Sequence, residues 1–199
     1  MEETHQGSDD LTNEELCLEI VKRNGMALRY VINQTEEICL AAVRQVAFVL
    51  QFVINQTEEI CSEAVRKEGY CLRYVKNQTE EICLEAVRKK GYCLRYVENQ
   101  TEEICLEAVK QSGWVLSYVK NQTEELCLIA VRQKGRELKH VKNQTLEICM
   151  AAIMNPNYGD ECDLDDPKRL EYVRDEEMKE ICKKYLEGKR FLTTKSAKK

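Results

Sequence analysis

Residues 77–98 have the sequence NQTEEICLEAVRKKGYCLRYVE, and close copies of this stretch fill most of the chain. The copies repeat every 22 residues, in units that begin at residues 11, 33, 55, 77, 99, 121 and 143. A fixed period of about 20 to 50 residues is typical of solenoid proteins, in which each repeat packs on its neighbours. The first unit departs from the pattern at its start, and the seventh breaks off at Pro156 and loses its second helix.

The first half of the unit, TEEICLEAVRKK in residues 79–90, predicts an amphipathic helix. At about 100° per residue, its apolar side chains fall on one face and its charged side chains on the opposite face. The apolar side chains are Ile82, Cys83, Ala86 and Val87. We expect that face to be buried. The opposite face, with pairs such as Glu85 and Lys89 four residues apart, is expected to be solvated.

The stretch NQTEE marks the start of that helix. Polar residues that accept hydrogen bonds are preferred at helix N-caps, and acidic residues in the first turn favour the positive end of the helix dipole. Two arrangements fit the sequence: Asn77 caps the helix with Glu80 reaching back as a capping box, or Thr79 caps it directly. The seventh unit has Leu146 in place of the glutamate, which would break the box there.

Glycine follows the first helix in most units, and a second, shorter helix follows the glycine. Gly91 is expected to end the first helix with a positive φ, as are the glycines at 25, 69, 113 and 135. The segment YCLRYVE then repeats the pattern of ICLEAVR, so two antiparallel helices form a hairpin. Helices below about 12 to 15 residues are marginal alone, so stacking must stabilise them. We therefore predict an all-α fold, an α-solenoid of stacked 22-residue helical hairpins.

The second unit departs most from the pattern. It has Val46-Ala47 where most units have glycine, and alanine disfavours a positive φ, so we expect this hairpin to turn differently or to continue as a longer helix. The residues that follow are strongly apolar and include Phe48 and Phe52. They belong either to deeper internal packing or to a self-association patch that would make the protein a homodimer.

The chain divides into five segments by these criteria. Residues 1–10 are polar and are expected to be disordered, and residues 11–154 form the seven repeats. Residues 155–167 are rich in Asn, Asp, Gly and Pro, as loops are. Residues 168–188 partly restore the pattern and predict a degenerate C-terminal capping unit. Residues 189–199 form a basic tail that is either solvated or makes a weak nucleic-acid or nuclear-import contact.

The composition disfavours several classes of protein. The net charge of −5 over 199 residues argues against broad nucleic-acid binding. The sequence opens without an apolar leader, and no apolar run reaches the ~18 to 20 residues of a membrane-spanning helix. We therefore expect an intracellular protein that does not enter membranes. In that setting the six Asn-Gln-Thr matches to the N-glycosylation pattern would not meet the glycosylation machinery.

Eleven cysteines raise the question of metals and disulfides. Seven occupy one position in successive units, from Cys17 to Cys149, and stacking spaces equivalent atoms by about 9 to 10 Å, too far for a disulfide. The sequence has no CxxC pair and only two histidines, so no zinc site is indicated. We expect buried thiols, no metal and no cofactor. We also expect no enzymatic activity, because the same glutamates recur in nearly every unit whereas an active site needs unique residues.

The second helices carry regular columns of aromatic and basic residues. One column contains Tyr30, Phe52, Tyr74, Tyr96 and Tyr118 and ends in His140; the basic residues beside it include Arg29, Arg73, Arg95 and Lys139. A further column contains Met26, Phe48, Tyr70, Tyr92 and Trp114 and ends in Arg136. Aromatic residues and arginine dominate binding hot spots, and the same types grip nucleic-acid strands. The candidate partner-binding residues are Arg73, Tyr74, Arg95, Tyr96, Trp114 and Tyr118; the alternative is that these side chains only pack between repeats.

The unit NQTEEICLEAVRKKGYCLRYVE resembles the tandem 22-residue repeats of uncharacterised proteins from giant viruses that infect amoebae, notably the marseillevirus and mimivirus groups. The resemblance covers residues 11 to about 154 and is strongest from 55 to 128. It implies a viral protein in the host cytoplasm, in the virus factory or in the virion, and it brings no activity and no functional residue. Our first hypothesis is a scaffold whose helical surface binds a protein partner. The second is a nucleic-acid-associated factor that uses the arginine and aromatic columns and the basic tail.

Overall fold

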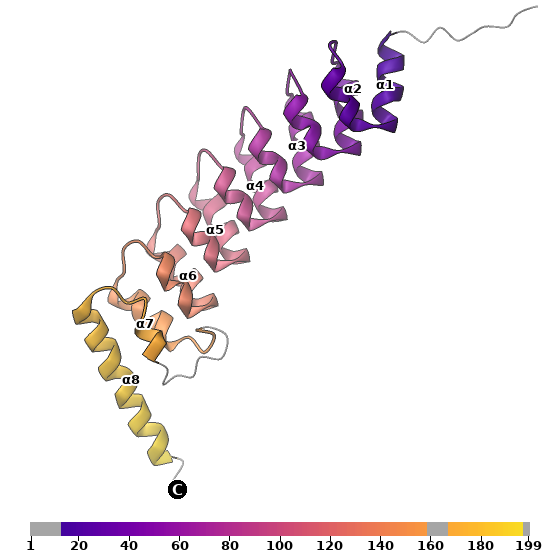
Figure 1. Ribbon diagram of the computed structural model, residues 1–199. Helices are drawn as coiled ribbons and strands as arrows, with labels where there is room; N and C mark the ends of the chain where they lie inside the picture. The colour runs from indigo at the N-terminus through magenta and orange to yellow at the C-terminus, as the bar shows by residue number, and fades with distance from the viewer. Residues whose placement is uncertain (1–12, 159–166, 197–199) are drawn as a thin grey trace, which may run out of the picture. The chain divides into compact units, whose positions relative to one another are not determined.

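The structure is a computed structural model that describes residues 13–158 and 167–196, with side chains as far as Gly188. Every regular element in this part of the chain is a helix, and α-helices alternate with short 3-10 helices (Figure 1). Within each unit, neighbouring helix pairs pack on one another, which confirms the predicted all-α solenoid fold of repeated hairpins. The chain forms two compact units, residues 1–98 (unit 1) and residues 99–199 (unit 2).

The described residues of unit 1 form four hairpins, each made of an α-helix and the 3-10 helix that follows it. The α-helices are α1 (Asn13–Arg23), α2 (Glu36–Gln45), α3 (Glu58–Lys67) and α4 (Glu80–Lys89). The 3-10 helices are η1 (Gly25–Tyr30), η2 (Ala47–Phe52), η3 (Gly69–Tyr74) and η4 (Gly91–Tyr96). The predicted apolar face is the buried one, and in α4 its members are Ile82, Cys83, Ala86 and Val87.

The described residues of unit 2 form three hairpins and a long helix after them. The α-helices are α5 (Glu102–Gln111), α6 (Glu124–Gln133), α7 (Leu146–Met154) and α8 (Glu176–Ser196). The 3-10 helices are η5 (Gly113–Tyr118), η6 (Gly135–His140) and η7 (Pro167–Leu170).

Threonine caps the α-helices, which decides between the two arrangements that the sequence allowed. In α4 the hydroxyl of Thr79 accepts a hydrogen bond from the backbone N–H of Ile82 at 3.3 Å. The equivalent threonine caps α2, α3, α5, α6 and α7 in the same way. Thr145 caps α7 although Leu146 follows it, because a direct threonine cap does not need the glutamate of a capping box.

The glutamine of the repeated stretch joins consecutive hairpins. The side-chain amide of Gln78 donates to the carbonyl of Tyr96 at 2.9 Å, and its oxygen accepts from the backbone N–H of Glu98 at 3.0 Å. The thiol of Cys83 donates to the same oxygen at 3.5 Å. Equivalent contacts recur at Gln34, Gln56, Gln100, Gln122 and Gln144. A carboxamide both donates and accepts, so it can bind the carbonyl and the N–H of one backbone segment together.

The glycines do not have the positive φ that the sequence predicted. At Gly25, Gly69, Gly113 and Gly135 the backbone lies outside the left-handed region. The residue before the glycine ends the α-helix instead, in an extended conformation such as φ −145° and ψ 107° at Glu68. Glycine is needed for a close approach, because a Cβ at Gly69 would lie 2.9 Å from the carbonyl oxygen of Ala86 in the next hairpin.

The second hairpin turns as the others do, so the expectation of a different turn or a longer helix was wrong. Val46 ends α2 in the same extended conformation, with φ −137° and ψ 102°, and η2 has the same length as its neighbours. Ala47 begins η2 and is buried. The turn does not require a positive φ, so alanine is compatible with the backbone at this position.

The seventh hairpin is complete, contrary to the expectation that it loses its second helix. After an insertion that follows α7, η7 takes the place of that helix. The amide of Gln144 donates to the carbonyl of Tyr172 at 2.8 Å and its oxygen accepts from the N–H of Arg174 at 3.0 Å, as in the other repeats. Helix α8 follows and buries Cys182 against α7, where its thiol lies 3.8 Å from the sulfur of Met150.

The C-terminal part is therefore divided differently from the predicted segments. Residues 168–188 contribute η7 to the seventh hairpin and the first part of α8, and this helix continues through Ser196 into the stretch expected to be a tail. Gly188 does not interrupt it, and a Cβ there would meet open space. The predicted disordered segment 1–10 lies outside the described residues. Of the predicted loop 155–167, residues 159–166 also lie outside them.

Candidate functional site

The 3-10 helices of unit 1 present aromatic and basic side chains on one surface. A 3-10 helix has about three residues per turn, so residues three apart share a face. In η4 this places Tyr92 beside Arg95, with the guanidinium carbon 4.9 Å from the ring centre, while Cys93 and Leu94 face the core. We call the whole set the aromatic–arginine surface; it consists of Arg29, Tyr30, Phe48, Phe52, Tyr70, Arg73, Tyr74, Tyr92, Arg95 and Tyr96.

The rings of this surface pack against each other across neighbouring hairpins. Phe48 of η2 contacts Tyr74 of η3 edge to face, with ring centres 6.4 Å apart. Tyr70 of η3 makes the same kind of contact with Tyr96 of η4 at 6.5 Å and with Tyr92 at 6.0 Å. Such pairs add about 0.5 to 1.5 kcal/mol beyond the area that they bury. The expected role in packing between repeats is therefore present.

The arginines cover these rings from the solvent side. The guanidinium carbon of Arg73 lies 5.1 Å from the ring centre of Tyr74 and 5.8 Å from that of Tyr96. Arg29 spans Tyr30 and Phe52 in the same way, at 4.9 and 5.8 Å. When a guanidinium stacks on a ring, its N–H groups point outward, parallel to the plane of the ring. A carboxylate or phosphate can reach them there. The arginines are exposed, whereas most of the rings are half-buried.

The structure thus brings together Arg73, Tyr74, Arg95 and Tyr96 of the predicted partner-binding residues. Phe48 and Phe52, predicted for self-association, belong to the same surface of unit 1. Stacking against rings restricts the arginines before any ligand arrives. A surface that is already ordered loses less conformational entropy on binding than one built from free side chains.

Trp114 and Tyr118, the other two predicted residues, lie in unit 2. Their rings meet edge to face with centres 5.8 Å apart, and Trp114 is 39% exposed. Trp114 also lines a hollow of about 460 Å³ together with side chains of η6. The cationic and imidazole members of its lining are Lys134, Arg136, Lys139 and His140.

Glu137, in the same hollow, is a site residue that the sequence reasoning missed. It is 4% exposed and replaces the small or apolar residues Ala27, Val49, Cys71, Cys93 and Val115 of the other hairpins. Its carboxylate lies 3.5 Å from Nε2 of His140. Burial is the main cause that lowers the pKa of His140, and Glu137 opposes this shift. The signal was present in the sequence, because Glu137 is the first charged residue in a column that is uncharged in the preceding hairpins.

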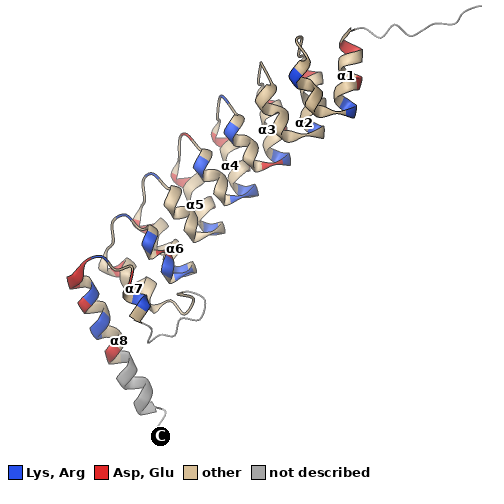
Figure 2. Ribbon diagram, viewed as in Figure 1, with Lys and Arg blue, Asp and Glu red and all other residues tan. Residues whose placement is uncertain are grey.

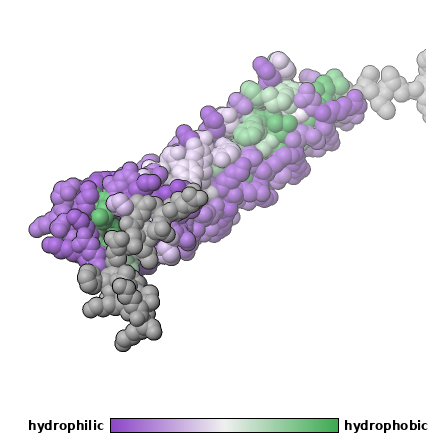
Figure 3. All heavy atoms as spheres, turned by 60° about the horizontal axis from the view of Figure 1, so that its bottom comes forward, coloured by the Kyte–Doolittle hydropathy of each residue, from purple (hydrophilic) through white to green (hydrophobic). Residues whose placement is uncertain are grey.

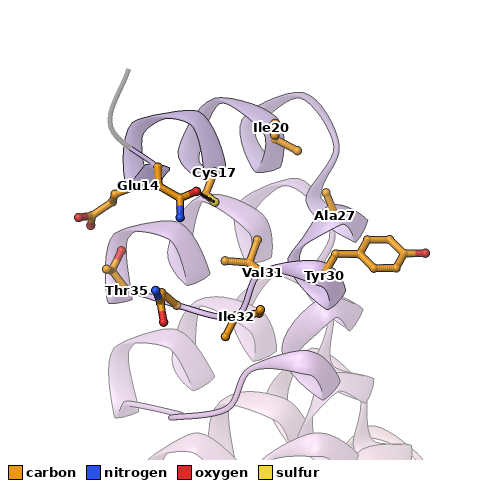
Figure 4. Close-up of a pocket in the computed structure, with 10 residues that line it drawn as sticks. Glu14, Cys17, Ile20, Ala27, Tyr30, Val31, Ile32 and Thr35 are labelled. Carbon is orange, nitrogen blue, oxygen red and sulfur yellow. Dashed lines mark hydrogen bonds between the residues drawn. The ribbon is translucent and has the colours of Figure 1, made fainter. Parts of the chain in front are cut away.

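A second hollow, of about 580 Å³, opens on the first hairpin of unit 1. Figure 4 shows its lining, with Cys17 and Ile20 from α1, Tyr30 from η1, and Val31 and Ile32 from the segment that leads to α2. Sequence reasoning did not find it, because Cys17, Ile20 and Val31 occupy positions that are buried in the later repeats and look like core residues in the pattern.

The repeated cysteines are buried and poorly suited to nucleophilic chemistry. Burial raises the pKa of the Cys39, Cys61 and Cys83 thiols to about 11, and a nearby glutamate adds to each shift. Burial raises the pKa of Cys71 and Cys93 to about 12. The thiolate is the reactive and metal-binding form, so these groups are inert near neutral pH.

The described residues show neither a metal-binding cluster nor a membrane-spanning helix. Among the side chains that the structure describes, no group of three or more His, Cys, Asp or Glu could hold a metal ion. In the same part of the chain, no helix has the length and apolar character needed to cross a membrane.

Comparison with known proteins identifies the repeats. The family model "Domain of unknown function (DUF4116)" matches residues 13–56, 57–101, 79–123 and 101–146. The matches overlap, and each spans about two of the 22-residue repeats. A search of curated proteins found no match to the chain, and a search of solved structures found none either. The tandem matches span most of the repeat region, and the chain is therefore a tandem-repeat member of the DUF4116 family.

Proposed function

We propose that this protein is a non-enzymatic repeat scaffold that binds a protein partner through the aromatic–arginine surface of unit 1. The observation that carries the proposal is the row of guanidinium groups stacked over rings in successive hairpins, such as Arg73 over Tyr74 and Tyr96. Arginine and tyrosine are over-represented among the residues that dominate protein interfaces. Trp114 and Tyr118 belong to the same proposal as contact residues of unit 2.

The charges of the surface suggest the chemistry of the partner. Arg29, Arg73 and Arg95 place three positive charges over aromatic rings, and each guanidinium can donate paired hydrogen bonds to a carboxylate. A partner segment that combines acidic and aromatic or aliphatic side chains fits this surface best. Basic residues recur on the short helices and at the ends of the α-helices of successive repeats (Figure 2), and in unit 1 Arg29, Arg73 and Arg95 of the 3-10 helices lie over aromatic rings.

A nucleic-acid-associated role is the second candidate, because arginines and rings also hold single-stranded nucleic acids. The net charge of −5 weighs against it. The basic residues 189–199 were part of this hypothesis, and their side chains lie outside the described part. Binding that weakens steeply with salt, measured with labelled single-stranded DNA and RNA, would favour this candidate.

The test is affinity capture of the tagged full-length chain from infected amoebae, with and without nuclease. The resemblance to giant-virus repeats sets the choice of cell and is the sole basis for our further proposal of a viral protein of the host cytoplasm, virus factory or virion. We expect a nuclease-resistant, stoichiometric protein partner that the Arg73→Ala/Arg95→Ala variant no longer retains.

The matched control removes two exposed arginines from the α-helical surface of the same unit. Arg44 and Arg66 make ion pairs with Glu63 and Glu85 rather than stacks on rings. The Arg44→Ala/Arg66→Ala variant should therefore keep the partner. Equal loss in both double variants would indicate an effect of net charge alone. Retention in both would remove the aromatic–arginine surface from the interface.

A further inference from the structure

The first hairpin of unit 1 exposes positions that the following hairpins bury. Leu16 is 46% exposed and Ile20 is 44% exposed. Their equivalents in α2 and α3 are buried; they are Ile38, Ala42, Ile60 and Ala64. In those helices this face packs toward the preceding hairpin. In α1 no described residue covers it.

The side chains around η1 show the same lack of a preceding neighbour. Tyr74 and Tyr96 are half-buried because a ring of the preceding hairpin, Phe48 or Tyr70, packs on each. Tyr30 has no such ring before it among the described residues and is 76% exposed. Ile32 is 87% exposed, although its position is exposed in the later repeats too, as at Ile54. We call this region the open end and define it by Leu16, Cys17, Ile20, Tyr30 and Ile32; all of these except Leu16 line the hollow in Figure 4.

Figure 3 shows a hydrophobic area over the first hairpins, beside the grey N-terminal trace. The preceding residues of the chain have the wrong composition to cover it. Residues 1–12 read MEETHQGSDDLT, in which Met1 and Leu11 are the only large apolar side chains. Contiguous exposed apolar side chains are often found at interfaces. The covering surface must therefore bring apolar side chains of its own.

The charges of α1 indicate a second copy of the same helix. Glu14 and Glu15 occupy its first turn, and Lys22 and Arg23 occupy its last turn. When two such helices pack antiparallel with Leu16 of one facing Ile20 of the other, the acidic start of each lies at the level of the basic end of the other. This is the self-complementarity that a two-fold symmetric interface requires. At 100° per residue, Arg23 is the one of these four charged residues that falls on the side of Leu16 and Ile20.

Head-to-tail stacking of copies would instead place the open end against α8, which covers the hairpin surface that follows α7. The outward residues of α8 include the charged Glu180, Lys183 and Lys184 and also Ile181 and Tyr185, which are 47% and 42% exposed. Such stacking continues from copy to copy and would give a mass above that of a dimer, which would overturn the pairing proposed here.

We propose that the open end of unit 1 binds the open end of a second copy, with the two α1 helices antiparallel. This places the contact at Leu16 and Ile20 rather than at Phe48 and Phe52, the patch suggested by the sequence. The proposal is independent of the partner proposed for the aromatic–arginine surface, because the two regions share only Tyr30 and the contact proposed here rests on Leu16 and Ile20, which lie outside that surface.

The test is the mass of the full-length chain by light scattering, at concentrations from about 1 to 100 µM, where mass action favours a dimer at the upper end. We expect a mass approaching twice 23.2 kDa. Leu16→Glu with Ile20→Glu should return the mass to that of one chain, with unchanged helicity by circular dichroism. Leu146→Glu is the matched control, because Leu146 is similarly exposed at 41% on a helix of unit 2, and this variant should remain dimeric.

A mixing experiment tests the antiparallel pairing of charges. One variant carries Glu14→Lys and Glu15→Lys, and another carries Lys22→Glu and Arg23→Glu. Each alone places like charges together and should dissociate at least tenfold more readily, because like charges across an interface are repulsive. An equimolar mixture should dimerise again. Unchanged self-association of either variant would overturn the charge argument and with it the proposed pairing.

Three further results would overturn the proposal. The first is a single-chain mass for the wild type over the whole concentration range. The second is dimerisation that appears only after removal of residues 1–12, which would identify that segment as the occupant of the open end. The third is a dimer that Phe48→Glu dissociates and the Leu16→Glu/Ile20→Glu variant does not, which would return self-association to the aromatic–arginine surface.

Discussion

The outer surfaces of the first and the last hairpin of the described chain differ in whether other residues cover them. At the end of unit 2, α8 packs on α7, and Asn155, Tyr158 and Arg169 are buried beside it. We call this region the closed end. At the start of unit 1, the open end leaves Leu16 and Ile20 exposed on α1. Each hairpin of a solenoid depends on its neighbours, so a terminal hairpin needs either a cap or a partner.

The closed end shows what such a cap consists of. The side chain of Asn155 donates to the carbonyls of Val131 and Arg132, both at 2.7 Å, and so binds carbonyl groups at the end of α6. Arg169 donates to the carbonyls of Ile153 and Asn155 at 2.7 and 2.8 Å. The described part of the chain begins with α1 itself, and within that part no residue covers Leu16 and Ile20. The comparison teaches that the same repeat is covered by other segments of the chain at one end and has exposed apolar residues at the other.

Raising the pH is expected to have the largest effect and to act first on unit 1. Burial raises the pKa of nine thiols; those in unit 1 are Cys39, Cys61, Cys71, Cys83 and Cys93, and those in unit 2 are Cys105, Cys127, Cys149 and Cys182. Because each pKa is raised above its unfolded value near 9.0, the unfolded chain releases protons first. The associated stability is present below pH ~8.5 and is lost as the pH rises toward the folded pKa values.

Urea unfolding at pH 7.5 and at pH 9.5 measures this difference. The single tryptophan, Trp114, reports on unit 2, whereas circular dichroism reports on all helices. We expect the circular dichroism midpoint to fall more than the fluorescence midpoint. Cys71→Val with Cys93→Val should reduce the gap, because Val49 and Val115 already occupy this position in other hairpins. If the circular dichroism and fluorescence midpoints fall by the same amount between pH 7.5 and pH 9.5, unit 1 is not the more pH-sensitive unit.

Removing Arg169 should break the closed end. This residue is 1% exposed, and Arg169→Ala leaves the carbonyls of Ile153 and Asn155 without their donors and opens a cavity. We expect a loss of about 3 kcal/mol in the free energy of unfolding, measured by urea titration of Trp114 fluorescence. Lys183→Ala, an exposed change on α8, is the control and should shift stability by less than about 0.5 kcal/mol. A neutral Arg169→Ala would show that the closed end does not stabilise unit 2.

Gly69→Ala tests the close approach between hairpins away from either end. A Cβ there would lie 2.9 Å from the carbonyl oxygen of Ala86, so the next hairpin must shift. We expect a destabilisation of about 1 to 3 kcal/mol, as for other overpacked sites. Ala47→Gly is the reciprocal change in the previous hairpin and should cost only about 0.4 to 1 kcal/mol, through the entropy of the unfolded chain. Equal effects would indicate that backbone freedom, not space, selects glycine.

The sequence predicted what depends on local chemistry and missed what depends on neighbouring repeats. Helix faces and the start at NQTEE follow from periodicity and capping, and the structure bears them out. The contacts of Gln78 join it to residues 96 and 98, 18 and 20 positions away, and a periodic sequence does not indicate which side chains meet at that distance. Arg169 was missed because the insertion before η7 hides its place in the column that contains Glu137.

For the candidate site, the columns of the sequence identified the right residues but not their arrangement. Periodicity placed Arg73, Tyr74, Arg95 and Tyr96 on successive second helices, and the 3-10 geometry then decided which rings each guanidinium covers. The sequence did not indicate the open end, because its residues follow the repeat pattern. Leu16 and Ile20 fit the core pattern, and only the absence of a described neighbour makes them surface residues.

Gln78→Ala should have an intermediate effect inside unit 1. It removes the donor to the carbonyl of Tyr96 and the acceptor of the Glu98 N–H, at 2.9 and 3.0 Å. Both backbone groups lie near the surface, where water can replace the amide in part. We expect a loss of about 1 to 2 kcal/mol in the free energy of unfolding by urea titration. Asn77→Ala, at the exposed neighbouring residue, should be close to neutral, and an equal loss there would argue against the glutamine as the connector.

Leu146→Glu should have the smallest effect and the opposite sign. α7 is the one described α-helix capped by threonine that begins with an apolar residue, and Leu146 is 41% exposed. A glutamate there would interact favourably with the positive end of the helix, as the first residues of α2 to α6 do. We expect a gain of about 0.3 to 1 kcal/mol at low salt that shrinks as salt is added, measured by urea titration. Because Thr145 already caps α7, a loss of stability would mean that Leu146 packs against the chain more than its exposure indicates. The glutamate of the capping box, which the sequence also allowed, would then add no stability to α7.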